Sequence, residues 1–206
     1  MNRRSGIDSK SNILNAALKI FSEYGYRGAS MRMIAHNAKI SVGGLYIHFK
    51  NKEELCLTLM KKRLGDLSQE LKKALEGVKN PVEAITLFIT INLEYAKRHK
   101  ELILTQSKER GFTFGLGLKR SFFKKQRTLI EEILKKGIDS GDFSECDVKE
   151  TTKIIMGTLR GFVLSMVVDA YNLFTPEECS KLILYGLLRR NDKPANEKTN
   201  EFKGRS

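Results

Sequence analysis

The sequence predicts an all-α protein, and three observations support this prediction. Along most of the chain, apolar residues recur every three or four positions, which is the spacing of one face of a helix. Residues that cap helices stand just before these apolar segments, and glycines follow several of them. Only 3 prolines occur in 206 residues, and no segment alternates apolar and polar residues as a half-buried strand would. We therefore expect about nine helices and essentially no sheet.

The first three predicted helices follow one another closely. The first presents one apolar face, which comprises Ile13, Leu14, Ala17, Ile20, Phe21 and Tyr24. Gly25 is its expected end, because glycine readily takes the left-handed conformation that follows a helix. Ser30 is the expected N-cap of a short second helix and Ser41 that of a short third helix, and the turn 38–41 joins the two. Two short helices joined by such a turn form a helix-turn-helix candidate.

Capping residues also place the remaining helices. Asn51, with Glu54 three residues later, opens a long fourth helix that Gly77 ends. Asn80-Pro81 opens a strongly apolar fifth helix, which we expect to be buried. The other expected segments are a sixth helix near 99–109, a glycine-rich loop at 111–117, and helices at about 118–140, 148–171 and 176–189.

Positive charge is concentrated near the N-terminus. Residues 1–52 hold 9 Lys or Arg against 2 Asp or Glu, so they carry over half of the net charge of +13. Such a segment is typical of a nucleic-acid-binding module, although a solubilising surface charge explains it equally well. We expect a helix-turn-helix domain at 8–54 with its motif at about 30–49, a larger helical domain at 55–190, and a polar, disordered tail at 191–206.

Several classes of site are not predicted. The 3 cysteines are widely spaced and form no CxxC pair, so neither a disulfide framework nor a zinc site is expected. His36, His48 and His99 lack the spacing with carboxylates that a catalytic triad or a metal site needs. The Gly43-Gly44 pair follows no predicted strand and lacks the spacing of a phosphate loop. We therefore expect no catalytic residue, no metal and no cofactor.

The location of the protein is predicted from what its sequence lacks. The N-terminal residues contain no apolar segment of the kind that a secretory signal has. No apolar run approaches the length that spans a bilayer. We therefore expect a cytoplasmic protein with no membrane partner.

One signature runs through the first quarter of the chain. It consists of Phe21, Gly25, Ser30, Ile34, Ala35, Ser41, Leu45, Tyr46, Phe49, Lys52 and Leu55. With this combination, residues of about 12–56 resemble the DNA-binding domain of TetR-type transcriptional regulators. The resemblance implies a ligand-responsive regulator, most often a repressor, that binds a palindromic operator in double-stranded DNA as a homodimer. A small hydrophobic effector in the C-terminal domain would release it. The alternative is a helical small-molecule-binding protein or enzyme whose basic N-terminus is incidental.

The resemblance also implies particular DNA contacts. Ser30 and Tyr46 match phosphate contacts, Lys52 matches a phosphate-binding lysine, and Arg32 matches a position that can reach a guanine edge. The serines stand at helix N-termini, which favour phosphate. Val42, Gly43 and Gly44 match positions that meet bases, and His48 matches a backbone contact. The complete expected set is Ser30, Met31, Arg32, Ser41, Val42, Gly43, Gly44, Tyr46, His48, Lys50 and Lys52.

Two departures from the family pattern affect the expected reading of bases. Lys39 stands where the turn often has glycine, so the turn must accommodate a side chain. Val42 and Gly44 replace residues that are often polar. We therefore expect base readout to depend on Arg32, on apolar contacts such as Val42 with a thymine methyl, and on DNA shape.

The effector is expected in the body of the subunit. The candidate pocket residues are Phe88, Asn92, Tyr95, Phe114, Phe122, Gln126, Arg160 and Met166. Aromatic residues at helical spacing are equally explained as core. Arg110 and Arg160 would suit an acidic head such as that of a fatty acid or acyl-thioester, whereas Glu94 and Asp169 would suit a lipophilic cation. We favour an acidic or neutral lipid-like effector.

The resemblance implies that the eighth and ninth helices pair with those of a second subunit. Their composition agrees, because they carry more apolar residues than one subunit needs to bury. The expected interface residues are Ile155, Leu159, Phe162, Val163, Leu182, Ile183, Tyr185 and Leu187. An intramolecular core is the alternative explanation for the same residues.

Overall fold

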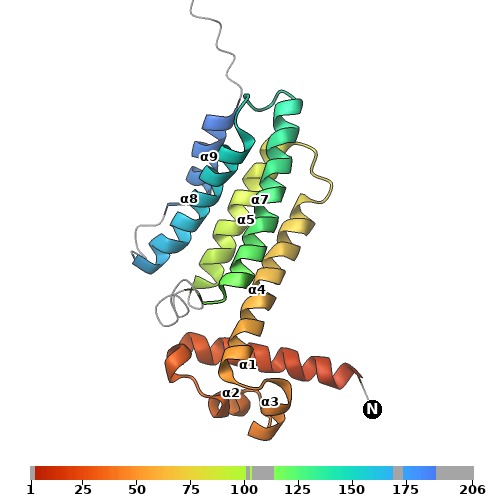
Figure 1. Ribbon diagram of the computed structural model, residues 1–206, viewed down its shortest axis with the longest axis vertical. Helices are drawn as coiled ribbons and strands as arrows, with labels where there is room; N and C mark the ends of the chain where they lie inside the picture. The colour runs from red at the N-terminus through yellow and green to blue at the C-terminus, as the bar shows by residue number, and fades with distance from the viewer. Residues whose placement is uncertain (1–2, 101–102, 104–113, 169–173, 189–206) are drawn as a thin grey trace, which may run out of the picture.

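The computed structural model describes residues 3–100, 103, 114–168 and 174–188, and for residues 3–8 and 166–168 it describes the backbone alone. The described residues form eight α-helices and no strand, and a single isolated β-bridge joins Phe143 to Leu188. This confirms the predicted all-α class. The expected sixth helix lies almost entirely outside the described residues, as does the tail 191–206. Figure 1 shows a small group of helices at one end of a long helical bundle.

The small group, which we call the head, consists of α1 (Arg3–Gly28), α2 (Met31–Asn37) and α3 (Val42–His48). The first regular stretch of α1 ends at Gly25, as predicted. Gly25 does take a left-handed conformation, with φ of 72°, but it forms a kink, and the helix resumes as far as Gly28. The amide of Ala29 donates to the carbonyl oxygen of Gly25 at 3.2 Å, which closes this last turn.

Serine caps begin both short helices of the head, as predicted. The hydroxyl oxygen of Ser30 accepts from the amide of Met33 at 3.2 Å, and that of Ser41 accepts from the amide of Gly44 at 2.9 Å. Each bond satisfies one of the amides that a helix N-terminus leaves without an intrahelical partner. Between the two helices, Lys39 has a φ of 55°, so the turn is made with a lysine in the left-handed region.

The head has its own apolar core, and α4 (Lys52–Leu75) takes part in it. Asn51 caps this helix by accepting from the amide of Glu54 at 2.8 Å, and the carboxylate of Glu54 accepts from the amide of Lys50 at 2.8 Å. The fully buried members of the core include Ile13, Phe21, Ile34, Leu45, Phe49, Leu55 and Leu59. The first two turns of α4 are therefore part of the head.

The rest of α4 belongs to the body, together with α5 (Pro81–Arg98), α7 (Leu116–Asp139), α8 (Val148–Val168) and α9 (Pro176–Leu187). As predicted, α5 is apolar and largely buried, and it is the central helix of the body because it packs against α4, α7, α8 and α9. The centre of the body core includes Ile85, Phe88, Ile89, Ile130, Leu134 and Phe162. The start of α7 at Leu116 is two residues earlier than predicted.

One helix connects the two cores. Leu67 and Leu71 of α4 are buried in the body core, whereas Leu64, between them and the head, packs against both cores. The hydroxyl of Tyr95 on α5 donates to the carbonyl oxygen of Arg63 at 2.8 Å, which fastens α4 to the centre of the body. A single continuous helix therefore contributes side chains to both cores.

Candidate functional site

The outer side of α3 is open to solvent. Leu45 is completely buried and fixes the helix on the head, whereas Val42, Tyr46 and Ile47 are 38%, 49% and 84% exposed. A Cβ added at Gly43 would meet no other described atom within 4 Å. Val42, Gly43 and Tyr46 therefore lie on the exposed side of α3, and their contacts with DNA stay a prediction. The prediction missed Ile47, although it lies one helical turn after Gly43 and so on the same side.

The second glycine of the pair faces inward. Gly44 is partly buried, and a Cβ there would lie 3.1 Å from the hydroxyl oxygen of Ser41. That hydroxyl already accepts the amide hydrogen of Gly44, so a side chain would crowd the cap. Gly44 therefore accommodates the cap of α3, and its contact with bases stays a prediction.

On α2, the predicted residues divide between surface and core. Ser30 and Arg32 are exposed and line a hollow of about 560 Å³ with His36 and Lys19. Met31, which the sequence predicted as a DNA contact, is 8% exposed and packs in the head core. The residue directly after an N-cap can face either way, and here the packing of α2 on α1 turns Met31 inward.

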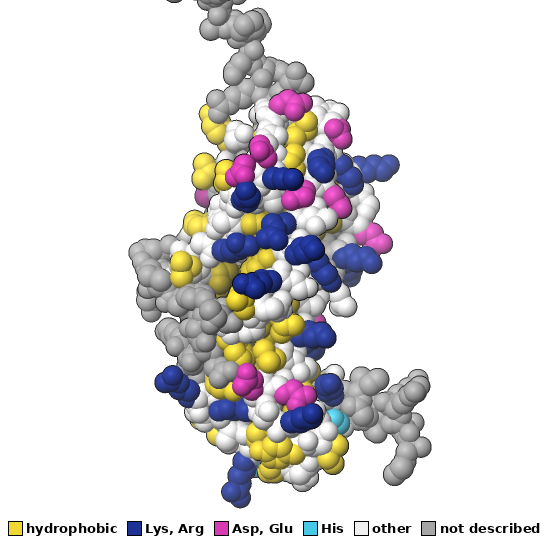
Figure 2. All heavy atoms as spheres, viewed as in Figure 1, with side chains coloured by type: hydrophobic (Ala, Val, Ile, Leu, Met, Phe, Trp, Pro, Cys, Tyr) yellow, Lys and Arg dark blue, Asp and Glu magenta, His cyan; other side chains and the backbone are white. Residues whose placement is uncertain are grey.

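Both cap serines retain a hydroxyl hydrogen that they can donate. Because Ser30 and Ser41 accept the helix amides through oxygen, their O–H groups remain available to a phosphate beside the helix N-termini. Lys50 is also exposed, whereas His48 is partly buried at the end of α3. In Figure 2, hydrophobic and basic side chains lie side by side at the end of the molecule where Figure 1 places α2 and α3.

The side chain of Lys52 forms its hydrogen bonds inside the head. Its ammonium donates to the carbonyl oxygens of Tyr26 and Ala29, each at 2.7 Å, and lies 3.5 Å from that of Arg27. It also stands 4.5 Å from the centre of the Tyr26 ring. The carbonyls of Tyr26 and Arg27 lie in the last turn of α1, where the helix carries partial negative charge, and that of Ala29 directly follows the helix. This arrangement conflicts with the predicted phosphate contact, because the three donors of the ammonium point toward the protein.

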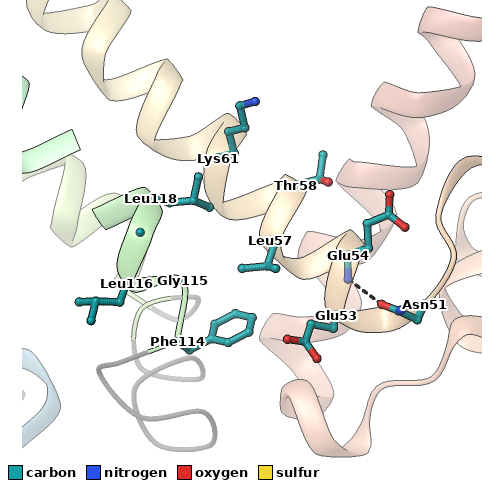
Figure 3. A pocket seen from close by; sticks show the side chains of 11 residues that line it. Asn51, Glu53, Glu54, Leu57, Thr58, Lys61, Phe114, Gly115, Leu116 and Leu118 are labelled. Atoms are coloured by element: carbon teal, nitrogen blue, oxygen red, sulfur yellow. Dashed lines mark hydrogen bonds between the residues drawn. The ribbon is translucent and has the colours of Figure 1, made fainter. Parts of the chain in front are cut away.

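A groove separates the head from the first turn of α7 (Figure 3). It has a volume of about 760 Å³. In Figure 3, the ring of Phe114 points toward the base of α4, where Leu57 faces it. Phe114 is 9% exposed and packs in the head core, with its ring centroid 6.3 Å from that of Tyr26. The side chain therefore joins the body to the head and also lines the groove, and its role toward an effector stays a prediction.

The other predicted pocket residues lie within the body. Phe88 and Phe122 are buried in its core, and the hydroxyl of Tyr95 is bound to α4 as described. The amide of Asn92 donates to the carbonyl oxygen of Phe88 at 2.9 Å, within its own helix. The guanidinium of Arg160 is exposed and lies 4.7 Å from the centre of the Phe123 ring. The side chain of Met166 lies outside the described residues.

Gln126 is the unusual member of this set. It is 4% exposed on α7, and neither its amide oxygen nor its amide nitrogen has a hydrogen-bond partner among the described residues. A buried polar group without a partner costs about 1–3 kcal/mol. Gln126 is therefore a polar group available to a ligand inside an otherwise apolar core.

The predicted dimer residues require a larger correction. Ile155, Leu159, Phe162 and Leu187 are between 0% and 7% exposed and belong to the body core, so they have almost no surface left to bury against a partner. Val163 and Ile183 are partly buried, and Leu182 and Tyr185 are exposed. Both sides of α8 are apolar, so its sequence pattern alone could not show which side faces the core. Its exposed side carries Ile154, Gly157, Gly161 and Leu164.

Neither a metal centre nor a membrane anchor emerges from the described residues. Within them, no three His, Cys, Asp or Glu residues are grouped as metal ligands would be. None of the described helices combines the length and apolar character that crossing a bilayer requires.

Comparison with known families decides the identity of the fold. The family model described as bacterial regulatory proteins, tetR family, matches residues 13–59, and that described as YsiA-like protein, C-terminal region, matches residues 60–186. The chain belongs to the tetR family. The resemblance seen in the first quarter of the sequence is thereby confirmed. This tetR-family protein is a ligand-responsive, DNA-binding transcriptional regulator, and regulators of this family act as dimers.

Individual relatives extend over most of the tetR-family chain. The fatty acid metabolism regulator protein of Bacillus subtilis is 28% identical over 160 residues, which are 76% of this chain and 82% of that protein. The crystal structure of FadR from Bacillus subtilis in complex with stearoyl-CoA has a TM-score of 0.68 and 23% identity, covering 85% of this chain and 95% of that one.

A third relative is described with a different ligand. A regulator from Saccharomonospora viridis in complex with choline has a TM-score of 0.74 and 13% identity, covering 89% of this chain and 99% of that one. At these identities, the likeness to the two solved structures is one of fold.

Proposed function

We propose that this protein is a repressor that binds a palindromic operator as a homodimer and leaves it when an effector binds in the body. The observation that carries the proposal is the open face of α3, flanked by the exposed groups of Ser30, Arg32 and Lys50, on a head that α4 joins to the body. The major groove is about 12 Å wide and admits a helix of this kind.

Binding to the DNA that flanks its own gene tests the first part of this proposal. Fluorescence anisotropy at several salt concentrations should show log K falling linearly with log salt, with a slope of about −0.9 for each phosphate neutralised. Binding that does not depend on salt, or no preference over a random duplex, would contradict it. Two heads that read a palindrome should require half-sites about 34–36 Å apart, or a multiple of this spacing.

The proposed dimer uses the exposed sides of α8 and α9. Ile154, Leu182 and Tyr185 are 67%, 74% and 67% exposed, which is costly for large apolar side chains unless a partner covers them. On the same helices, a Cβ added at Gly157, Gly161 or Gly186 would meet no described atom within 4 Å, so another helix can approach closely. This supports a four-helix contact between two subunits.

Leu182→Glu should therefore convert the dimer to a monomer in sedimentation experiments at micromolar concentration, because it places a charge in the proposed apolar contact. Leu116→Glu is the matched control, since Leu116 is an exposed leucine, 38% accessible, on α7. An unchanged dimer in Leu182→Glu, or a wild-type monomer, would exclude this interface.

For the effector we propose a lipid-like acyl compound, and a long-chain acyl-CoA is the first to test. The relative described with stearoyl-CoA shares the fold, and the body core around Phe88, Phe122 and Phe162 is apolar. Gln126 offers an amide donor and an amide acceptor that lack partners inside this core. Such groups can bind the polar part of a ligand whose chain lies among apolar side chains.

A thermal-shift comparison of stearoyl-CoA with choline tests the effector class, because a ligand that binds the folded state raises Tm. Gln126→Met should stabilise the free protein by removing the unpartnered amide, yet reduce the shift caused by stearoyl-CoA. Thr152→Val is the matched control: Thr152 is also buried, at 1% exposure, and its hydroxyl also lacks a partner among the described residues. Stabilisation by choline alone would contradict the acyl effector.

A further inference from the structure

The solvent face of α3 is apolar over most of its length. Its three exposed large side chains are Val42, Tyr46 and Ile47, and Gly43 adds no side chain between them. The seven residues of α3 include no Lys, Arg, Asp or Glu. Among Val42, Gly43, Tyr46 and Ile47, only Tyr46 has a side-chain group able to donate a hydrogen bond. The face therefore cannot read bases through the paired hydrogen bonds that Arg, Asn or Gln would make.

Ile47 stands out within this face. Its exposed fraction of 84% is the largest among the exposed large hydrophobic residues of the described chain. The adjacent side chain, Tyr46, is half exposed, and Leu45 on the inner side fixes the orientation of the helix. Ile47 therefore projects from a fixed position into whatever lies against α3.

The surroundings of this face identify its partner. Arg32, Lys39 and Lys50 are exposed on the elements before and after α3, and the segment 1–52 carries 9 Lys or Arg against 2 Asp or Glu. A small apolar centre with a basic rim is complementary to a groove that has phosphates along its edges. In the major groove of DNA, the apolar group presented at the base edges is the C5 methyl of thymine.

We propose that α3 reads thymine methyl groups, with Ile47 and Val42 as the residues that determine this specificity. The inference rests on the proposed function as an operator-binding regulator and names the feature of the operator that is read. The helix of seven residues is about 10 Å long, so its face can cover a few successive base pairs. The absence of a side chain at Gly43 lets the helix approach the bases closely enough for these methyl contacts.

Uracil in place of thymine tests the proposal directly, because uracil lacks the methyl group and keeps the same hydrogen-bonding edges. A pool of duplexes with random cores is amplified with dTTP, and sites are selected with the full-length protein. The selected sites are then synthesised with uracil at the thymines of the half-sites. We expect affinity to fall about fourfold for each contacted methyl. Uracil placed outside the half-sites should leave affinity unchanged.

Substitution of Ile47 connects the effect to this side chain. Ile47→Ala should weaken binding to the thymine site and abolish most of the difference between thymine and uracil sites. Leu116→Ala is the control, because Leu116 is also an exposed aliphatic residue, 38% accessible, but lies on α7, outside both α3 and the proposed dimer contact. Since Ile47 is exposed, its substitution should leave the melting temperature unchanged, which separates loss of contact from loss of fold.

The outcomes separate this inference from the function on which it rests. No selection of any sequence from the pool would contradict operator binding itself. Selection followed by equal affinity for thymine and uracil sites would leave operator binding intact and overturn the methyl readout; this is also the result expected if α3 contacts a protein or a lipid surface. A thymine preference that Ile47→Ala leaves intact would likewise overturn the assignment.

Discussion

The ammonium nitrogen of Lys52 lies 2.7 Å from the carbonyl oxygen of Ala29. Ala29 immediately precedes Ser30, the cap of α2, whereas Lys52 is the first residue of α4. One side chain therefore fastens the helix that passes into the body to the segment that begins the helix-turn-helix. The same ammonium also binds the carbonyl oxygen of Tyr26, so it holds the end of α1 at the same point.

If Lys52 positions the head and does not bind phosphate, Lys52→Met should lower thermal stability and DNA affinity together while leaving the salt dependence of binding unchanged. Lys50→Met is the control, because Lys50 is exposed and stands beside the same helix start. Lys50→Met should leave thermal stability unchanged and should reduce the magnitude of the slope of log K against log salt by about 0.9, the value for one phosphate. A reduced slope in Lys52→Met with unchanged stability would restore the phosphate contact.

Phe114 should couple the body to the head. It immediately precedes Gly115, the N-cap of α7, and its ring packs in the head core beside Tyr26. Phe114→Ala should cost about 3–5 kcal/mol of stability, as is usual for a buried phenylalanine. It should also leave a head that binds DNA but responds less to stearoyl-CoA, measured as release of labelled operator.

Phe143→Ala is the control for this coupling. Phe143 is 2% exposed and belongs to the segment that connects α7 to α8. Figure 1 shows this connecting segment at the end of the body away from the head. Phe143→Ala should lower the free energy of unfolding about as much as Phe114→Ala does, but should release labelled operator as the wild type does. Identical release curves for Phe114→Ala and the wild type would show that the signal passes through α4 alone.

The turn between α2 and α3 should gain stability from a glycine. Lys39 has a φ of 55°, and a side chain in this region costs about 1–2 kcal/mol. Glycine avoids this cost, but its greater freedom in the unfolded chain cancels part of the gain. Lys39→Gly should therefore raise the free energy of unfolding by about 0.5–1 kcal/mol in urea denaturation. Lys39→Ala retains the strained Cβ and should show no such gain; equal gains in both variants would implicate the charge of the lysine.

Gly137 is required by the packing of a phenylalanine ring. A Cβ at Gly137 would overlap the ring of Phe143, which is almost fully buried. Gly137→Ala should therefore destabilise the protein by about 1–3 kcal/mol through overpacking, despite the better helix propensity of alanine. Gly65→Ala is the control, since a Cβ there meets no described atom within 4 Å, and it should stabilise by up to about 1 kcal/mol. Similar effects of the two substitutions would contradict the packing of Phe143 against α7.

His99 should make stability depend on pH. Burial, and then the positive charges of Arg63 and Arg98, lower the pKa of His99 below 6.5, although Asp66 and Glu70 oppose this shift. The unfolded chain then binds the proton more readily, so stability is fully present above pH 6.5 and decreases as pH falls toward the folded-state pKa. Melting temperatures between pH 7.5 and 5.5 should show this decrease, and His99→Gln should reduce it. An unchanged pH dependence in His99→Gln would assign the decrease to other groups.

The features that the sequence predicted well are local ones. The caps at Ser30, Ser41 and Asn51 depend on residues three positions apart, so a short stretch of sequence contains all the partners involved. The inward and outward sides of α3 were also largely predictable, because Leu45 and Phe49 are its clear apolar anchors. Ile47 was missed because an exposed isoleucine resembles a core residue in sequence.

The features that could not be predicted depend on contacts between distant segments. The partners of Lys52 are carbonyl oxygens 23 and 26 residues away, and no sequence pattern marks a backbone carbonyl as a ligand. Phe114 lies in the head core although it precedes a helix of the body. The orientation of α8 depends on which of its two apolar sides packs on α5, and periodicity is the same for both.

Because α4 contributes side chains to both the head core and the body core, its position has a consequence for protein engineering. Leu55, Leu59 and Met60 fill the head core, and Phe114 completes it from far along the chain. A transplanted head that ended at residue 54 would expose the apolar surface these side chains cover. A hybrid regulator with a new sensor would therefore need to retain α4 beyond Met60 and to supply an aromatic side chain in the place of Phe114. The unit that can be exchanged between regulators is thus discontinuous in sequence.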